Sequence, residues 1–183
     1  MVYIVVLVLI VLIGIWLVAI YNSLVKHKNL VKEGWSGIDV QLKRRADLIP
    51  NLLETVKGYM KHEADLLKEV TELRNHSLEN NDVAEQGKTE AALSQSLMKL
   101  FAVAEDYPEL KADHNFRELQ SELSKIEEDV QMARRYYNGT VRNFNIMIES
   151  FPSNLVASSF NFRQSDYFEI DNSEDREVPD VKF

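Results

Sequence analysis

The sequence contains no cysteine among its 183 residues, so disulfide bonds and thiolate chemistry are excluded. It also lacks a stripe of basic residues. The net charge is −8, and the segment 161–183, with seven acidic and three basic residues, carries half of that excess. Because nucleic-acid binding depends on clustered positive charge, the sequence predicts no nucleic-acid partner.

Motifs for catalysis and cofactor binding are missing as well. The sequence has no P-loop, no glycine-rich nucleotide fingerprint and no nucleophile elbow. Of the four histidines, His62 stands beside Glu63, but no second histidine follows four residues later, as the zinc-protease helix motif requires. The sequence therefore predicts no metal site, no cofactor and no catalytic residue.

Charge is also absent from the first 25 residues, and the first charged side chain is Lys26. Residues 2–20 are almost wholly valine, leucine and isoleucine. A helix of about 20 residues rises roughly 30 Å, which is the thickness of the hydrocarbon core of a bilayer. We therefore predict a transmembrane anchor at 1–25, a helical bundle domain at 26–160 and an acidic tail at 161–183.

A cleaved signal peptide is the competing interpretation of this start. It fits less well, because the start has no positive n-region, the apolar run is too long, and residues 17–20 offer a single small residue, Ala19, near a cleavage point. The basic residues Lys26, Lys28 and Lys32 follow the apolar run directly. The positive-inside rule therefore predicts that the domain lies in the cytoplasm and Met1 outside.

Apolar residues recur at a spacing of three to four through the rest of the chain, which predicts long amphipathic helices. The first stripe runs from 31 to 73 and contains Pro50. Proline lacks the N–H group that would bond residue 46, and it disfavours a helical conformation at Ile49. We expect either a kink at 47–50 or a short break with Pro50 beginning a new helix. The first expected loop is 78–82.

Two further helices follow in the pattern. One should begin near Asp82, which can act as N-cap, and run to Ala104 before Pro108 ends it. The last keeps a regular 4-3-4-3 spacing from 112 to 151. From Gln164 on we expect weak order, because the tail is acidic and short of apolar residues. The predicted fold class is all-α: a transmembrane helix followed by an antiparallel, up-and-down, coiled-coil-like bundle of long helices.

Charged residues on the apolar stripe suggest a buried polar network. Arg45 and Glu63 both fall on the stripe, and Asp47 and Asn51 lie between them. A buried charge is costly unless it is paired, so we expect these four residues to form an arginine–carboxylate network that fixes the register of the helices. The alternatives are a ligand-binding or catalytic pair of acids, and a stripe that is simply exposed at these positions.

Several motifs in the chain resemble those of the LemA family of bacterial membrane proteins. They are Tyr21-Asn22-x-Leu24-Val25, Trp35, residues 38–45, Asp47-Leu48-Ile49-Pro50-Asn51-Leu52, Tyr107-Pro108-x-Leu110-Lys111, Phe116-x-x-Leu119-Gln120, Arg134-x-x-Tyr137-Asn138, Asn145 and Phe151-Pro152. The resemblance implies one N-terminal span with its short N-terminus outside, an antiparallel bundle of long helices, and no established enzymatic activity. It also implies a location at the bacterial cytoplasmic membrane.

The first functional hypothesis is a non-enzymatic, membrane-anchored scaffold that self-associates and organises or shapes the membrane. Its partners would be the lipid bilayer and further copies of the chain. The residues of the expected assembly face are Tyr21, Asn22, Trp35, Arg134, Tyr137, Asn138 and Asn145.

The second hypothesis is an adaptor or regulator of another membrane protein, such as a membrane protease or an envelope-stress component. In that case the acidic tail with Tyr167, Phe168 and Ile170 would capture the partner. An enzyme is the third and least favoured class, because no motif with a mechanism is present.

Overall fold

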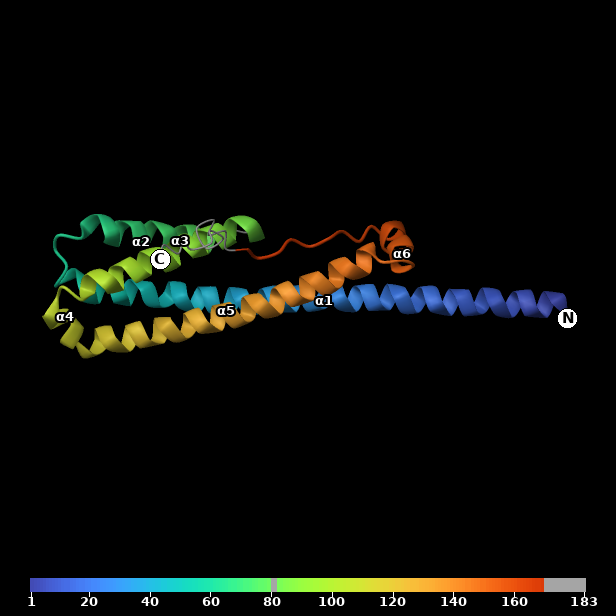
Figure 1. The fold of residues 1–183 in the computed structure, drawn as a ribbon, viewed down its shortest axis with the longest axis horizontal. Helices are drawn as coiled ribbons and strands as arrows, with labels where there is room; N and C mark the ends of the chain where they lie inside the picture. The colour runs from blue at the N-terminus through green and yellow to red at the C-terminus, as the bar shows by residue number, and fades with distance from the viewer. Residues whose placement is uncertain (80–81, 170–183) are drawn as a thin grey trace, which may run out of the picture. The chain divides into compact units, whose positions relative to one another are not determined.

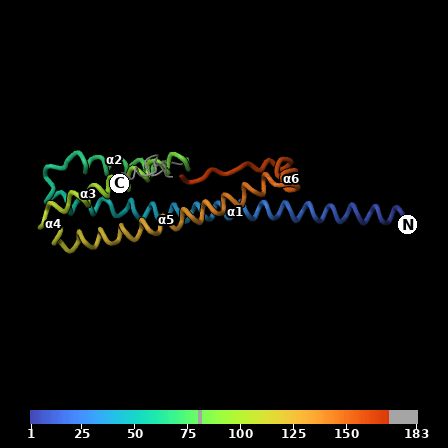
Figure 2. Tube along the Cα trace, in the orientation of Figure 1, coloured from blue at the N-terminus to red at the C-terminus, as the bar shows by residue number. Residues whose placement is uncertain are grey.

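The computed structural model describes residues 1–79 and 82–169, and within these ranges the chain forms six α-helices and no strand (Figure 1). The predicted all-α class is therefore confirmed. The helices are α1 (Val2–Lys57), α2 (Ala64–Glu79), α3 (Val83–Ala104), α4 (Pro108–Ala112), α5 (His114–Glu149) and α6 (Ser153–Ser159). The Cα trace shows the chain course through these helices and the extended segment that follows α6 (Figure 2).

Helix α1 passes through Pro50 without a break, so a new helix does not begin there. The missing hydrogen bond is replaced from another helix, because Arg74 Nε of α2 donates to the Ala46 carbonyl oxygen at 3.0 Å. That carbonyl is the group which the N–H of a non-proline residue at position 50 would have bonded. Arginine thus satisfies an acceptor that would otherwise lack a partner beside the buried Ala46.

The continuous helix expected up to residue 73 is wrong, because the chain leaves α1 at Lys57 and turns before α2 begins at Ala64. The N–H groups of Tyr59 and Met60 both donate to the Val56 carbonyl, at 3.0 and 2.9 Å, and so close the end of α1. The apolar stripe does not reveal this turn because both helices bury their apolar residues in one core, which includes Val56, Met60 and Leu67. The phase of the pattern therefore continues across a change of chain direction.

Other helix ends agree with the sequence. Asp82 caps α3 as predicted, because its Oδ1 accepts from the N–H groups of Ala84 and Glu85, both at 3.0 Å. Helix α3 ends at Ala104, and Pro108 is the first residue of the short helix α4. The last long helix, expected at 112–151, is α5 at His114–Glu149, and the peptide bond between Phe151 and Pro152 is cis.

The chain divides into two units that share the long helices. Unit 1 consists of Met1–Ile38 and Ala133–Tyr167, and unit 2 of Asp39–Met132 with the described residues Phe168 and Glu169. In unit 1, α1 and α5 run antiparallel, since Ser23 meets Met147 while Gly34 meets Tyr137. A Cβ at Gly34 would lie 3.1 Å from the Tyr137 Cα, so this glycine allows the two backbones to come close.

In unit 2, segments of α1 and α5 and the helices α2, α3 and α4 enclose one apolar core. Its members include Ile49, Leu52, Val70, Leu100 and Leu110, each 0% exposed. The antiparallel arrangement of α1 and α5 also holds in this unit, because Arg44 and Arg45 meet Asp129 and Glu127, respectively. Helices α2 and α3 pack against each other.

The segment after α6 is better ordered than the sequence predicts. Asn161 adopts a left-handed conformation with φ 56°, which asparagine tolerates better than most residues, and the chain then extends along α5. We call residues 163–167 the strap. The strap and Phe168 are held by specific contacts, so the weak order expected from Gln164 on is wrong for the described residues. The rest of the predicted tail, 170–183, lies outside the described residues.

Candidate functional site

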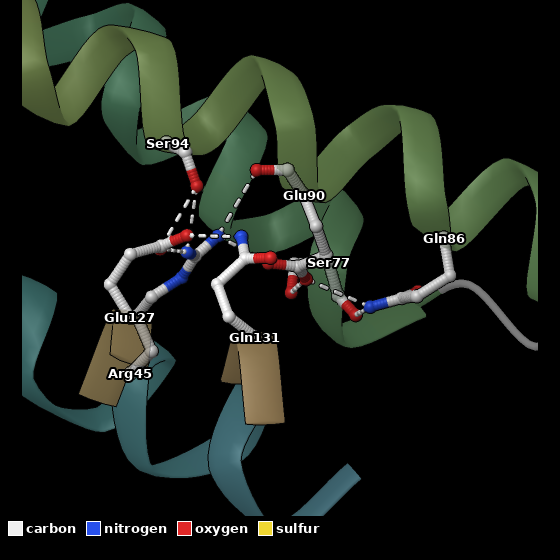
Figure 3. A network of polar contacts seen from close by, with 7 residues as sticks. All are labelled: Arg45, Ser77, Gln86, Glu90, Ser94, Glu127 and Gln131. Atoms are coloured by element: carbon white, nitrogen blue, oxygen red, sulfur yellow. Dashed lines mark hydrogen bonds and ion pairs between the residues drawn. The ribbon is translucent and has the colours of Figure 1, made fainter. Parts of the chain in front are cut away.

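Arg45 is the centre of a buried polar cluster in unit 2 (Figure 3). The residue is 1% exposed. Its Nη2 donates to Glu90 Oε2 at 2.5 Å and to the Glu90 carbonyl at 3.2 Å. Its Nη1 donates to Glu127 Oε2 at 2.5 Å and to Ser94 Oγ at 2.9 Å. One guanidinium on α1 therefore binds one carboxylate on α3 and one on α5.

A second ring of hydrogen bonds surrounds this pair of ion pairs. Glu90 Oε1 accepts from Ser77 Oγ and, at 2.9 Å, from Gln86 Nε2. On the other side, Ser94 Oγ donates to Glu127 Oε2 at 3.1 Å, and Gln131 Nε2 donates to Glu127 Oε1 at 3.1 Å. Figure 3 shows the seven side chains converging from α1, α2, α3 and α5. Both oxygens of each carboxylate therefore have partners.

The cluster is suited to fixing the register of four helices rather than to chemistry. The Glu90 side chain is 2% exposed and the Glu127 side chain 37% exposed, so Glu90 is the acid that depends more on its protein partners. Among the described residues, no group of three histidine, aspartate or glutamate side chains could hold a metal ion. A buried arginine with satisfied partners fixes geometry because every misaligned arrangement leaves a charge unpaired.

Three of the four residues predicted for the network lie elsewhere. Asp47 and Asn51 are exposed, and Glu63 is half-buried in the turn before α2, where its Oε1 accepts from the Tyr107 hydroxyl at 3.5 Å. Asp47 is two residues from Arg45 in one helix, so the two side chains do not face each other. Glu63 left the stripe because the helix ends at Lys57. The partners assigned to Arg45 are therefore corrected to Glu90 and Glu127.

Glu90 carried a signal in the sequence that the stripe analysis overlooked. It lies three residues before Leu93 and seven before Leu97, so it shares their face of α3. Both leucines are buried, at 1% and 5% exposure. A carboxylate on this second apolar face would have been the natural partner for an arginine on the first.

Residues of the expected assembly face are instead occupied within unit 1. The Tyr137 side chain is buried, and its hydroxyl donates to the Asp166 carbonyl of the strap at 2.9 Å. Asn145 donates from Nδ2 to the Ser165 carbonyl and accepts from the Ser165 N–H at Oδ1, both at 2.9 Å. These two residues therefore bind the strap within the same chain.

The pKa of Tyr137 is raised to about 12, first by burial and second by the negative charge of Asp166. The ring of Trp35 also packs here, edge-on to Tyr137 at 5.5 Å between centroids. The phenol is therefore held neutral as a hydrogen-bond donor to the strap.

The other assembly-face residues are distributed unevenly. Tyr21 contacts the ring of Phe160 at 4.8 Å and that of Phe162 at 5.9 Å. Asn22 is exposed, Arg134 is half-buried, and Asn138 is half-buried and interacts with other residues of the chain. Tyr137 and Asn145 thus bind the strap, and Trp35 packs against Tyr137, so the seven residues do not share one open face.

The tail residues of the adaptor hypothesis are also partly occupied. Phe168 is 0% exposed in unit 2, and the next residue, Glu169, places its carbonyl oxygen against Gly87 of α3. A side chain at position 87 would collide with that oxygen, so glycine is required there. Tyr167 is 39% exposed, and Ile170 lies outside the described residues. Phe168 therefore serves the core of the chain and is not available to capture a partner.

The N-terminal part of α1 remains uncovered. Its most apolar window is long and hydrophobic enough to cross a membrane, and none of that window is buried inside the chain. The side chains from Val2 to Ile13 are between 47% and 74% exposed, apart from Tyr3 at 90%. A helix with apolar side chains on every face is stable only where lipid or protein surrounds it.

Comparison with known proteins agrees with these features. The LemA family matches residues 34–183. Protein LemA of Metamycoplasma hominis is 28% identical over 138 residues, which cover 74% of this chain and 63% of that protein. Magnetosome protein MamQ 2 of Paramagnetospirillum magneticum is 21% identical over 175 residues, which cover 81% of this chain and 64% of that protein.

A further magnetosome protein MamQ, from Magnetospirillum gryphiswaldense, is 21% identical over 174 residues, covering 81% of this chain and 64% of that protein. The chain therefore spans a little under two thirds of the length of these relatives. The names of the family and of these relatives denote no enzymatic activity. Since the family match extends from residue 34 to residue 183, the chain belongs to the LemA family as a membrane-associated, all-α protein.

Proposed function

We propose that this protein is a single-span scaffold of the bacterial cytoplasmic membrane, which self-associates and organises or shapes that membrane. The observation that carries the proposal is the uncovered apolar part of α1, followed at once by a helical domain. Lys26 and Lys28 are exposed at the end of the apolar run. Basic residues at that place favour the cytoplasmic side, so the domain lies inside and Met1 outside.

Self-association of the span is favoured by its composition. It carries no charged or amide side chain from Val2 to Tyr21, so helix contacts there depend on close packing. A Cβ added at Gly14 would have no other part of the chain within 4 Å, which leaves the backbone at this position open to a second helix. Within unit 2 the Arg45 cluster joins α1, α3 and α5 through ion pairs, which suits a structural role.

The experiment that tests this proposal is a measurement of mass. Full-length protein in mild detergent is compared with a chain starting at Lys26, by light scattering or mass photometry. We expect the full-length protein to form a defined oligomer. The shorter chain should form an assembly with fewer copies. Two monomeric samples would refute self-association.

A matched pair of variants locates the contact. Gly14→Leu should weaken the oligomer, because a large side chain keeps two helix backbones apart. Val8→Leu, at an exposed position of the same apolar segment, should leave the mass unchanged. Equal masses for Gly14→Leu and the parent chain would place the contact elsewhere.

A further inference from the structure

The region around α6 lies beside the apolar part of α1 in unit 1, and we call residues 150–162 the α6 corner. A groove of about 570 Å³ lies between these two segments. Its lining residues are Leu17, Val18 and Tyr21 from α1, and Leu155, Val156, Ser159 and Phe160 from the corner. The Tyr21 and Phe160 rings touch, with centroids 4.8 Å apart. The corner therefore sits next to residues that precede Lys26, within the predicted span.

The outer surface of the α6 corner is apolar and uncovered. Phe151 is 79% exposed, Leu155 59% and Phe160 62%. The whole stretch from 150 to 162 contains no charged residue and is flanked by Glu149 and Arg163. Three large exposed apolar side chains on one short segment mark a contact surface rather than a solvated turn.

The position along α1 gives the depth of the corner. At 1.5 Å per residue, Leu17 lies about 13 Å and Tyr21 about 7 Å before Lys26 along the helix axis. The headgroup region adds only about 5–7 Å on each side of the hydrocarbon core. If Lys26 is at the outer edge of the headgroups, Tyr21 is at the hydrocarbon boundary and Leu17 is inside it. A deeper Lys26 would move both residues further into the lipid.

Three serine hydroxyls of the corner donate to nearby carbonyl groups, whereas the buried Oδ1 of Asn154 has no hydrogen-bond partner. The hydroxyls of Ser158 and Ser159 donate to the Leu155 carbonyl at 3.0 and 2.7 Å, and Ser153 donates to the Met147 carbonyl at 2.6 Å. Backbone bonds continue past the helix, since the Phe162 N–H donates to the Ala157 carbonyl at 2.9 Å. A segment in contact with lipid needs its backbone and hydroxyl groups bonded internally, and these bonds supply part of that pairing.

We propose that the α6 corner inserts into the membrane leaflet that faces the domain, with Phe151, Leu155 and Phe160 against lipid acyl chains. The bilayer is the occupant that these observations favour, because the exposed apolar surface is continuous with the span through the groove at Leu17–Tyr21. Lys28 Nζ lies 5.7 Å from the centre of the Phe162 ring, at the end of the corner that is further from the hydrocarbon core. A lysine at this place can contact the anionic headgroups. This inference rests on the proposed function, since it requires residues 2–25 to span the bilayer.

The test uses full-length protein in vesicles of phosphatidylcholine and phosphatidylglycerol. Because the chain has no native cysteine, single nitroxide labels can be placed by Phe151→Cys and Leu155→Cys. Leu9→Cys, in the middle of the apolar segment, and Met98→Cys, exposed on α3, serve as references for lipid and water. Collision with oxygen, which concentrates in lipid, is compared with collision with a water-soluble nickel chelate.

We expect labels at 151 and 155 to resemble the Leu9 label, with an oxygen-to-nickel collision ratio several-fold above that of the Met98 label. A high nickel accessibility at 151 and 155 beside a lipid-exposed Leu9 would place the corner in water and overturn the inference, while the anchor would stand. Low accessibility to both reagents would mean that a second copy covers the corner, which also overturns it. Nickel access at Leu9 would refute the anchor itself.

Discussion

Arg45 is almost completely buried and pairs with two carboxylates. The loss of stability on replacing Arg45 therefore depends on how well each carboxylate tolerates losing its cation. Glu90 sits in the interior with a side-chain exposure of 2%, whereas Glu127 reaches solvent at 37%. Removal of the guanidinium leaves Glu90 as the uncompensated charge. The loss of stability on replacing Arg45 therefore comes mainly from Glu90 of α3 and less from Glu127 of α5.

We expect Arg45→Met to lower the free energy of unfolding by about 3–5 kcal/mol, because a buried carboxylate loses its cation. The double variant Arg45→Met/Glu90→Leu should recover most of that loss. Urea unfolding of the protein in mild detergent, followed by circular dichroism, measures both. As a control, Arg44→Met removes a cation with 51% side-chain exposure and a 3.7 Å contact to Asp129, and it should cost at most about 1 kcal/mol. A double variant no more stable than the single one would contradict this account.

Tyr137 gives a prediction about alkaline pH. Its pKa is raised from 10 to about 12 in the folded chain, first by burial and second by Asp166. The unfolded chain therefore loses the phenol proton at a lower pH than the folded chain. The stability linked to this group is complete below pH 10 and is lost as the pH rises through about 12.

We expect Tyr137→Phe to be less stable than the parent at pH 8 by about 1 kcal/mol, because the hydrogen bond to the strap is lost. Between pH 8 and 11 the variant should lose less stability than the parent chain. Urea midpoints at the two pH values test this, with Tyr136→Phe, at an exposed neighbouring position in α5, as the control. A pH dependence of the Tyr137→Phe variant equal to that of the parent would argue against the assignment.

At the scale of elements, periodicity predicted the helices but not every chain reversal. The start of α3 at the Asp82 cap and the extent of α5 follow from local signals, a capping carboxylate and a continuous heptad spacing. The turn at 58–63 has Gly58 as its main local signal, and the apolar phase continues through it into α2. A stripe reports which residues are buried, and two helices that share one core can share one stripe.

The same limit applies to the Arg45 cluster. A charge on an apolar stripe indicated a buried polar group at position 45, but Glu90 and Glu127 are 45 and 82 residues away in the sequence. Which residues pair between two helices depends on how the helices are aligned. The spacing of apolar residues within one helix gives no information on that alignment. The strap contacts of Tyr137 and Asn145 were missed for the same reason, since their partners are irregular backbone at Asp166 and Ser165.

Two glycines in α1 test how closely α1 and α5 pack in unit 1. Gly34→Ala would place a Cβ 3.1 Å from the Tyr137 Cα and 3.3 Å from Thr140 Oγ1, so the α5 backbone would have to move by a few tenths of an ångström, which we expect to destabilise the protein. Gly37→Ala meets nothing within 4 Å and should stabilise the protein by about 0.5–1 kcal/mol through helix propensity. We expect urea midpoints to shift in opposite directions for the two variants. A gain at both positions would show that the backbone contact can relax.

At the scale of the whole molecule, orientation is the property that connects the fold with its surroundings. With Lys26 and Lys28 exposed after the span, Met98→Cys should react with a membrane-impermeant maleimide only after the bacterial cells are lysed. Val2→Cys, at the other end of the span, should react in intact cells. Labelling of Met98→Cys from outside would reverse the proposed topology. Neither measurement is confused by native thiols, since the chain has none.

The bond from Arg74 to the Ala46 carbonyl makes the order of mutation matter at two distant positions. While Pro50 is present, loss of Arg74 leaves that acceptor unpaired, at a cost of about 1–3 kcal/mol. If Pro50 is replaced first, the new N–H group bonds Ala46, and Arg74 becomes free to change. A line of descent that substitutes position 50 first can therefore lose Arg74 later without that cost. A line that substitutes Arg74 first passes through a less stable protein.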